Sequence, residues 1–218
     1  MKKIAIYHSP VGDIQLEYEN GAVTALKNAD ASSVKADPPS ELAERVFRQL
    51  DEYFIGTRRD FDFPCRLHGT PFQEKVWAAL REIPYGETRS YKEIAAAIGR
   101  PRAFRAIGAA NHANPILIAI PCHRVIGADG SLVGYGGGLA MKKALLELEK
   151  RQSAAYRKGY IGKEITILTE EAREINGERY RIGHTDTYVK AAVPDEKAEG
   201  NMLVAGKAVK LLTEEILL

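Results

Sequence analysis

The chain has 218 residues, of which 45% are hydrophobic and 28% charged, and its formal net charge is +2. This composition is typical of a soluble globular protein, and the length allows one large domain or two to three small ones. The sequence holds no apolar stretch near the roughly 20 residues of a membrane span and no signal-peptide core at its start, so we expect neither a membrane span nor secretion. Its two cysteines predict free thiols, and a reducing cytoplasm is the expected location.

The first third of the chain predicts a small sheet with one helix. Residues 3–8, 13–18 and 22–27 alternate apolar and polar side chains between turn sequences, which indicates short antiparallel strands. An amphipathic helix follows, with Ser40 as its N-cap and Gly56 at its end. We expect its apolar stripe to pack on the sheet.

The middle third predicts a helix-turn-helix. Thr70 and Pro71 begin an amphipathic helix that we expect to reach Ile83. The stretch 90–110 then predicts two short helices, which are separated by the Gly-Arg-Pro turn at 99–101.

The second helix of this pair is rich in small and basic side chains. Ala103 and Ala106 would let the helix approach another backbone closely, and Arg102 and Arg105 are suited to phosphates or a DNA groove. Residues 65–150 also hold the chain's surplus of basic residues. Two interpretations stay open: a nucleic-acid-binding helix, or an alanine-rich core helix beside a solvated basic face.

A thiol stands directly before an imidazole in the stretch IPCHRV (120–125), after an apolar run that we interpret as a strand. Attack by Cys122 needs the thiolate, whose unperturbed pKa is about 8.5, so a base such as His123 and a carboxylate that orients it are the usual arrangement. Glu149 could supply the carboxylate if its helix folds back, and Asn114 is a further polar neighbour. A buried, inert cysteine is the alternative.

Two further patterns could suggest a metal or nucleotide site, and both are incomplete. Cys65 and His68 have the spacing of metal ligands, but no second Cys/His pair stands at zinc-finger spacing. The glycine-rich stretch 129–139 lacks the Lys-Ser/Thr of a phosphate loop. We therefore expect a flexible loop or wing there, and neither a metal ion nor a cofactor in the protein.

The run from residue 70 to 149 resembles the DNA-binding and catalytic domain of the O6-alkylguanine-DNA alkyltransferases, also called methylated-DNA–protein-cysteine methyltransferases. Pro-Cys-His-Arg-Val (121–125) is the active-site signature of that family. The resemblance implies an α/β fold plus a helical, winged helix-turn-helix domain, with a ribonuclease-H-like sheet domain at 1–66 and the alkyltransferase domain at 67–152. We expect a small C-terminal β-barrel at 156–218.

The same resemblance implies roles for the residues around the thiol. Cys122 would accept the alkyl group in a single irreversible turnover. His123 would deprotonate it through a water, with Glu149 holding the imidazole and Asn114 fixing the turn. Tyr91 would protonate the departing guanine. The implied activity is repair of O6-alkylguanine, and of O4-alkylthymine, in double-stranded DNA.

The resemblance also implies how DNA is held. Arg105 would fill the gap left by an extruded nucleotide, which costs a few kcal/mol to flip, while the helix enters the minor groove. Gly136 stands where some relatives carry a serine, and Leu117 where some carry a proline, so the tolerance for bulky alkyl groups is open. The remaining implied contacts are Arg102, Ala103, Ala106 and Arg124 with DNA, and Val125, Tyr135 and Gly136 with the base.

The alternative function is a non-catalytic sensor of alkylated DNA or a nucleic-acid-binding regulator. The cysteine favours the enzyme, because non-reactive relatives replace it. We expect a monomer.

Residues 156–218 lie outside this resemblance. Their β-rich pattern resembles the TRAM domain of the tRNA methylthiotransferases, an OB-like barrel that binds RNA. Acidic and basic residues balance over residues 151–218, so contact with RNA and contact with a protein both stay open.

Overall fold

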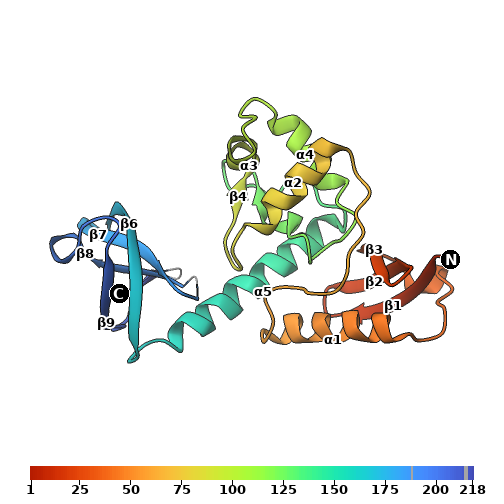
Figure 1. Cartoon of the computed structure of the whole chain (residues 1–218), viewed down its shortest axis with the longest axis horizontal. Coiled ribbons are helices and arrows are strands. Elements are labelled where there is room, and N and C mark those ends of the chain that lie inside the picture. Colours follow the sequence, from red (N-terminus) through yellow and green to blue (C-terminus); the bar gives the residue numbers. More distant parts are fainter. Residues whose placement is uncertain (188, 214–215) are drawn as a thin grey trace. The chain divides into compact units, whose positions relative to one another are not determined.

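A computed structural model describes residues 1–187, 189–213 and 216–218 (Figure 1). The chain forms two compact units, Met1–Glu149 and Lys150–Leu218. None of the described helices combines the length and the apolar character needed to cross a membrane.

The first unit begins with a three-stranded antiparallel sheet. Its strands are β1 (Lys3–Ser9), β2 (Gly12–Glu19) and β3 (Ala22–Asn28), paired in the order β1-β2-β3. Asn20 and Gly21 join β2 to β3, and both have positive φ, as a two-residue hairpin turn requires. The three predicted strands are confirmed.

One amphipathic helix, α1 (Glu41–Ile55), packs on this sheet (Figure 1). The Ser40 side chain accepts a hydrogen bond from the Ala43 amide, and Gly56 ends the helix at φ 87°. Both predicted ends are confirmed. The buried side chains of α1 are Ala43, Val46, Gln49, Leu50, Tyr53 and Phe54.

Three helices follow, α2 (Pro71–Arg81), α3 (Tyr91–Ala97) and α4 (Phe104–His112). The last two are the predicted helix-turn-helix pair. Helix α2 ends at Arg81 and does not reach Ile83 as predicted. Ile83 precedes Pro84, and a residue before proline disfavours the helical conformation.

A short parallel pair of strands, β4 (Arg89–Ser90) and β5 (Val125–Ile126), flanks these helices. The glycine-rich stretch from 127 to 137 contains no helix or strand. It leads into α5 (Gly138–Lys158), which is longer than the predicted helix.

The apolar run before the thiol is not a strand, so that interpretation is wrong. Only Ile116 makes a bridge, to Leu26 of β3, and Ile118 adopts φ 70°. A five-residue apolar run fits any buried segment, since burial alone does not fix backbone conformation. Cys122 then begins a short 3₁₀ helix, Cys122–Arg124.

The second unit contains a six-stranded sheet in the order β10-β11-β8-β7-β6-β9. In the described part of the chain, β10 and β9 are its two edges, so the expected closed barrel is not found there. The strands are β6 (Glu164–Ile175), β7 (Glu178–Thr185), β8 (Lys190–Pro194), β9 (Leu203–Lys207), β10 (Leu211–Thr213) and β11 (Ile216–Leu217).

Trp77 joins α2 to α4 and gives a test of the core. Its side chain is 1% exposed, and Nε1 donates to the Ala110 carbonyl at 2.9 Å. We predict that Trp77→Ala lowers the free energy of unfolding by about 3–5 kcal/mol, because it leaves a cavity in the core. Urea unfolding followed by circular dichroism measures this. The control is Leu139→Ala at a half-exposed position, for which we expect a change within about 0.5 kcal/mol. Equal midpoints for the two variants would contradict the assignment.

Candidate active site

Cys122 is fully buried, and two asparagines hold it. Asn114 Nδ2 donates to Cys122 Sγ at 2.9 Å and to the Ile120 carbonyl at 2.9 Å. Asn111 Nδ2 donates to the Cys122 carbonyl at 3.2 Å. Asn111 lies in the last turn of α4 and Asn114 comes two residues after the helix ends, so the end of the helix-turn-helix positions the thiol.

The surroundings of Cys122 keep its thiol protonated at neutral pH. Burial raises the pKa of Cys122 to about 11, although the Asn114 hydrogen bond and the charge of Lys142 lower it in part. A nucleophilic sulfur at this position therefore needs a base that takes its proton.

His123 has the tautomer of such a base. Its Nε2 lies 2.8 Å from Glu149 Oε1, and an ionised carboxylate can only accept a hydrogen bond, so Nε2 carries the hydrogen and Nδ1 the lone pair. Burial lowers the pKa of His123, so the ring is neutral at neutral pH. Within the described residues, no hydrogen bond joins the two side chains of Cys122 and His123 directly.

Glu149 is the centre of the buried polar cluster. Besides His123, it accepts hydrogen bonds from Tyr53 Oη at 2.7 Å and from Arg124 Nε and Nη2, each at 2.9 Å. Burial by itself would raise the pKa of Glu149, but the charges and hydrogen bonds of His123 and Arg124 hold it well below its usual range. The carboxylate is thus charged while fully buried.

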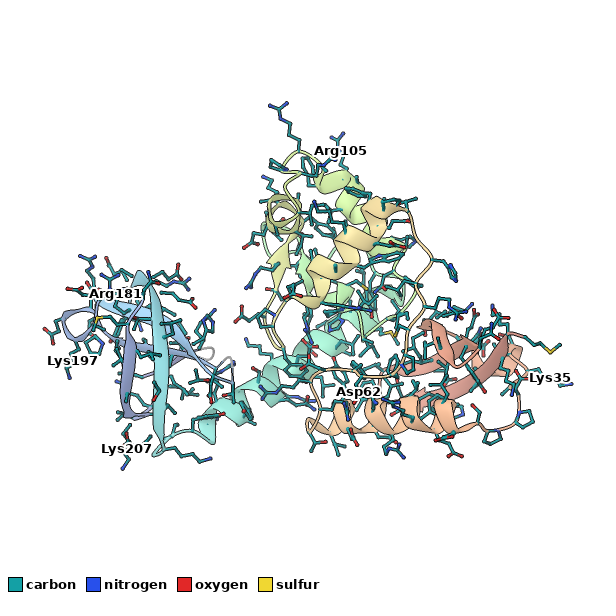
Figure 2. All side chains as sticks on the ribbon, in the orientation of Figure 1. Lys35, Asp62, Arg105, Arg181, Lys197 and Lys207 are labelled. Carbon is teal, nitrogen blue, oxygen red and sulfur yellow. The ribbon has the colours of Figure 1, made fainter. Side chains whose placement is uncertain are left out.

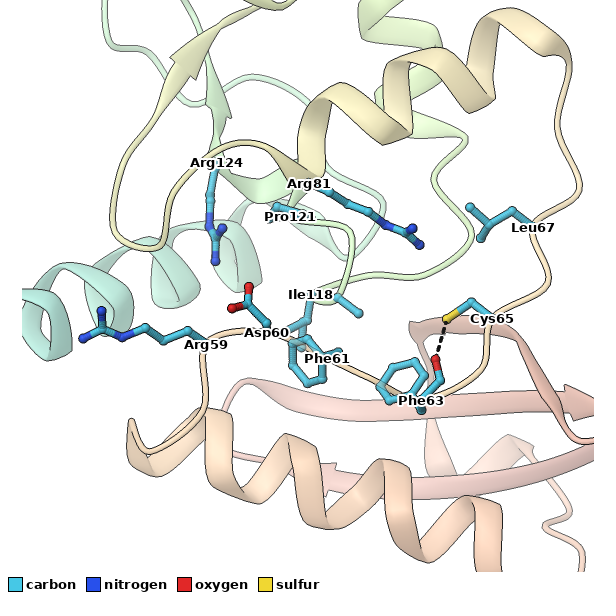
Figure 3. Close-up of a pocket in the computed structure, with 11 residues that line it drawn as sticks. Arg59, Asp60, Phe61, Phe63, Cys65, Leu67, Arg81, Ile118, Pro121 and Arg124 are labelled. Carbon is cyan, nitrogen blue, oxygen red and sulfur yellow. Dashed lines mark hydrogen bonds between the residues drawn. The ribbon is translucent and has the colours of Figure 1, made fainter. Parts of the chain in front are cut away.

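Arg124 was expected to contact DNA, and the structure places it elsewhere. The residue is 5% exposed, and its Nη1 donates to the Ile83 carbonyl at 2.7 Å. Figure 3 shows its guanidinium pointing toward the segment that carries Asp60, below the active-site turn. In this structure the guanidinium is buried and pairs with Glu149, so the DNA contact of Arg124 stays a prediction.

Lys142 is a buried residue that the sequence analysis missed. Its Nζ donates to the carbonyls of Val125, Val133 and Gly134 at 2.5, 2.9 and 3.4 Å, and so fastens the glycine-rich loop to β5. Burial lowers the pKa of Lys142 to about 8. Lys142 stands seven residues before Glu149 and so lies on the same face of the helix, and this spacing could have predicted its burial from the sequence.

Three buried polar atoms near the thiol have no hydrogen-bond partner within the described part of the chain. They are Asn111 Oδ1, His123 Nδ1 and the hydroxyl of Tyr135. The Tyr135 ring meets the His123 ring edge-on at 6.3 Å. Unsatisfied buried polar atoms are rare in folded proteins, so this group is suited to a polar ligand or solvent.

Of the three residues predicted to contact the base, Tyr135 belongs to this group and Val125 is also buried. Gly136 lies where an added Cβ would be 3.6 Å from Leu117 Cδ2. The hydroxyl of Tyr91 donates to the Val133 carbonyl at 3.0 Å.

The predicted DNA-contacting residues other than Arg124 gather at the start of α4. Arg102, Arg105 and Ala106 are exposed and Ala103 is half-buried. Figure 2 shows the Arg105 side chain extending away from the fold. The alternative of an alanine-rich core helix holds only for the opposite side of α4, where Ile107 and Ala110 are buried.

Cys65 lies apart from this cluster. It lines a cavity of about 340 Å³ behind the active-site turn, together with Pro121 and Arg124 (Figure 3). Burial raises the pKa of Cys65, and the charge of Arg81 opposes the rise. Among the described residues, no three His, Cys, Asp or Glu side chains are grouped as metal ligands would be.

Two family models match almost the whole first unit. Residues 2–67 match the ribonuclease-like domain of 6-O-methylguanine DNA methyltransferase, and residues 71–151 match the DNA-binding domain of the same family. The chain belongs to this family. The models leave residues 152–218 unmatched.

Individual relatives agree. A methylated-DNA–protein-cysteine methyltransferase of Methanosarcina barkeri is 49% identical over 153 residues, which cover 66% of this chain and 95% of the relative. The enzyme of Mycobacterium bovis is 48% identical, over 67% and 92% of the two chains. The crystal structure of Mycobacterium tuberculosis O6-methylguanine methyltransferase has a TM-score of 0.63 and 47% identity, over 70% of this chain and 94% of that one.

A further Mycobacterium tuberculosis structure, with a TM-score of 0.62 and 48% identity over 67% and 92% of the two chains, is a complex with DNA. DNA repair by transfer of an alkyl group from DNA to a protein cysteine is therefore the activity of this chain. The expected enzyme is confirmed over the non-catalytic alternative.

The depressed pKa of Glu149 predicts how the fold responds to acid. A carboxyl group whose pKa is lowered on folding stabilises the fold above its unfolded pKa of about 4.3, and this stabilisation is lost as the pH falls below that value. We predict that the free energy of unfolding falls between pH 5 and pH 3, and less steeply in Glu149→Gln. Chemical unfolding at several pH values measures both slopes, with Glu44→Gln, an exposed position on α1, as control. Equal slopes for the wild type and Glu149→Gln would contradict the assignment.

Proposed function

We propose that Cys122 accepts the alkyl group, and that the substrate is O6-alkylguanine, and also O4-alkylthymine, in double-stranded DNA. The observation that carries this proposal is the buried cluster in which Asn114 holds the sulfur and Glu149 fixes His123 with its lone pair on Nδ1. The chain would act as a monomer. It would also act only once, since the thioether that forms has no route back to a thiol.

The transfer can be written so that bonds and protons balance. The Cys122 proton passes to His123 Nδ1, through a bridging water. The thiolate sulfur then forms a bond to the alkyl carbon, while the bond from that carbon to O6 breaks and leaves its electron pair on the guanine. Tyr91 supplies the proton that lets guanine depart as a neutral base. Burial, and after it the charge of Cys122, raises the pKa of Tyr91, so its hydroxyl holds a proton to give.

The environments of the two cysteines support Cys122 as the acceptor. Cys122 has an oriented imidazole next to it in the chain, whereas the Cys65 thiol donates to the Phe63 carbonyl at 3.5 Å. The pKa of each is raised by burial, so the one with a base within reach is the one that reacts.

The stoichiometry of the product tests the acceptor. With an oligonucleotide that carries one O6-methylguanine, we predict a gain of one methyl group per protein molecule, without a cofactor, and then no further reaction. Cys122→Ala should abolish transfer and retain DNA binding, and Cys65→Ala should behave as the wild type. Intact-mass and peptide mass spectrometry distinguish these results. Continued turnover, or a methyl group on Cys65, would refute the mechanism.

We propose three domains, of which the first two carry the repair reaction. A ribonuclease-H-like domain at 1–66 and a winged helix-turn-helix alkyltransferase domain at 67–152 would carry the repair reaction. For 156–218 we propose a TRAM-like nucleic-acid-binding domain, which the long antiparallel strands of its sheet support. Because α5 continues to Lys158, its last turns precede this domain.

Truncation tests whether the C-terminal part serves the reaction. We predict that a chain ending at Lys158 keeps the rate of methyl transfer from free O6-methylguanine, because Cys122, His123 and Glu149 all lie before the cut. Binding to transfer RNA should weaken more than binding to a short lesion duplex, when each is measured at two salt concentrations. Unchanged binding to both would eliminate the nucleic-acid role and favour a protein partner. Lost transfer would show that the reaction needs this part.

A further inference from the structure

Phe104 is a large apolar side chain that is exposed at the start of α4. It is the first residue of that helix and is 41% exposed, between the small Ala103 and Arg105, the residue predicted to fill the gap in the stack. A single exposed apolar residue is ordinary on a protein surface. Its surroundings therefore decide whether it has a role.

The Phe104 ring contacts two features of the site. The guanidinium carbon of Arg105 lies 5.9 Å from the ring centroid. The ring also lines a mainly apolar cavity of about 400 Å³ between the start of α3, α4 and the glycine-rich loop. The other lining residues are Tyr91, Lys92, Gly108, Ala128, Val133 and Gly134.

We propose that Phe104 is a DNA-positioning residue, which packs against the extruded nucleotide and the neighbouring base step while Arg105 fills the gap in the stack. This proposal rests on the proposed function. Tyr91, Val133 and Phe104 line the same cavity, so a nucleotide bound there against Tyr91 would also lie near the ring of Phe104.

The chemistry of the side chain suits this task. Proteins that bind the minor groove commonly insert apolar side chains between base steps to unstack them. An aromatic ring adds contact area at a low cost in side-chain entropy, since it has only two rotatable bonds. Because the alanines nearby are too small to fill an opened step, Phe104 supplies the apolar surface that they lack.

The test compares two substrates. Phe104→Ala should slow repair of a duplex that carries one O6-methylguanine by about 10-fold, within the range that loss of one stacking contact produces. Its rate with free O6-methylguanine base should stay within about twofold of the wild type, because the free base needs no extrusion. Phe104→Leu should retain part of the duplex rate. The matched control is Ile55→Ala, an exposed apolar position on α1, which should change neither rate.

A direct measure of extrusion accompanies the rates. In the unreactive Cys122→Ala background, 2-aminopurine placed beside the lesion becomes fluorescent when its stack opens. Adding Phe104→Ala should reduce this signal at saturating protein. Wild-type duplex rates and fluorescence in the Phe104→Ala variants would overturn the proposal, as would equal slowing on both substrates. Absence of transfer by the wild type would instead refute the proposed function.

Discussion

The buried carboxylate of Glu149 is the interaction on which the active site depends. A charge removed from water is costly unless opposite charges and hydrogen bonds compensate it, and here Arg124, His123 and Tyr53 all donate to one carboxylate. These donors come from α1 and the active-site turn, while the acceptor lies on α5. One carboxylate therefore connects α1 to the catalytic turn. Its hydrogen bond with His123 also sets the tautomer of the imidazole.

This arrangement reconciles burial with reactivity. A fully buried thiol resists ionisation, and in the proposed mechanism this would protect a cysteine that reacts only once from other electrophiles. The neutral, fixed imidazole beside it can take the proton once a substrate is in place. Among the described residues, Asn111, Tyr135 and His123 each have a buried polar atom without a hydrogen-bond partner, and the polar edge of the base proposed as substrate would match them.

A buried lysine holds the glycine-rich loop in place through hydrogen bonds to backbone carbonyls. Lys142 is fully buried and its amine points at three carbonyls, two of them from the loop and one from β5. The loop in turn accepts the Tyr91 hydroxyl at Val133. Short polar contacts thus connect the loop to α3, through Tyr91, and to β5 and α5, through Lys142, and β5 directly follows the catalytic turn.

Much of the fold and of the candidate site follows from local patterns in the sequence. Turn residues, caps and periodicity predicted the three N-terminal strands, both ends of α1 and the helix-turn-helix, because those features depend on neighbours within a few residues. The motif of Cys122 and His123, with Asn114 and Glu149 at a distance, predicted the components of the site. The folded structure was needed to show that Arg124 faces inward to Glu149, that Lys142 holds the loop and that Ile116–Ile120 is irregular. Arg124 and Lys142 bond to groups well separated from them in the chain, and the sequence pattern does not say which buried groups a side chain will meet. For Ile116–Ile120, an apolar run predicts burial and not backbone conformation.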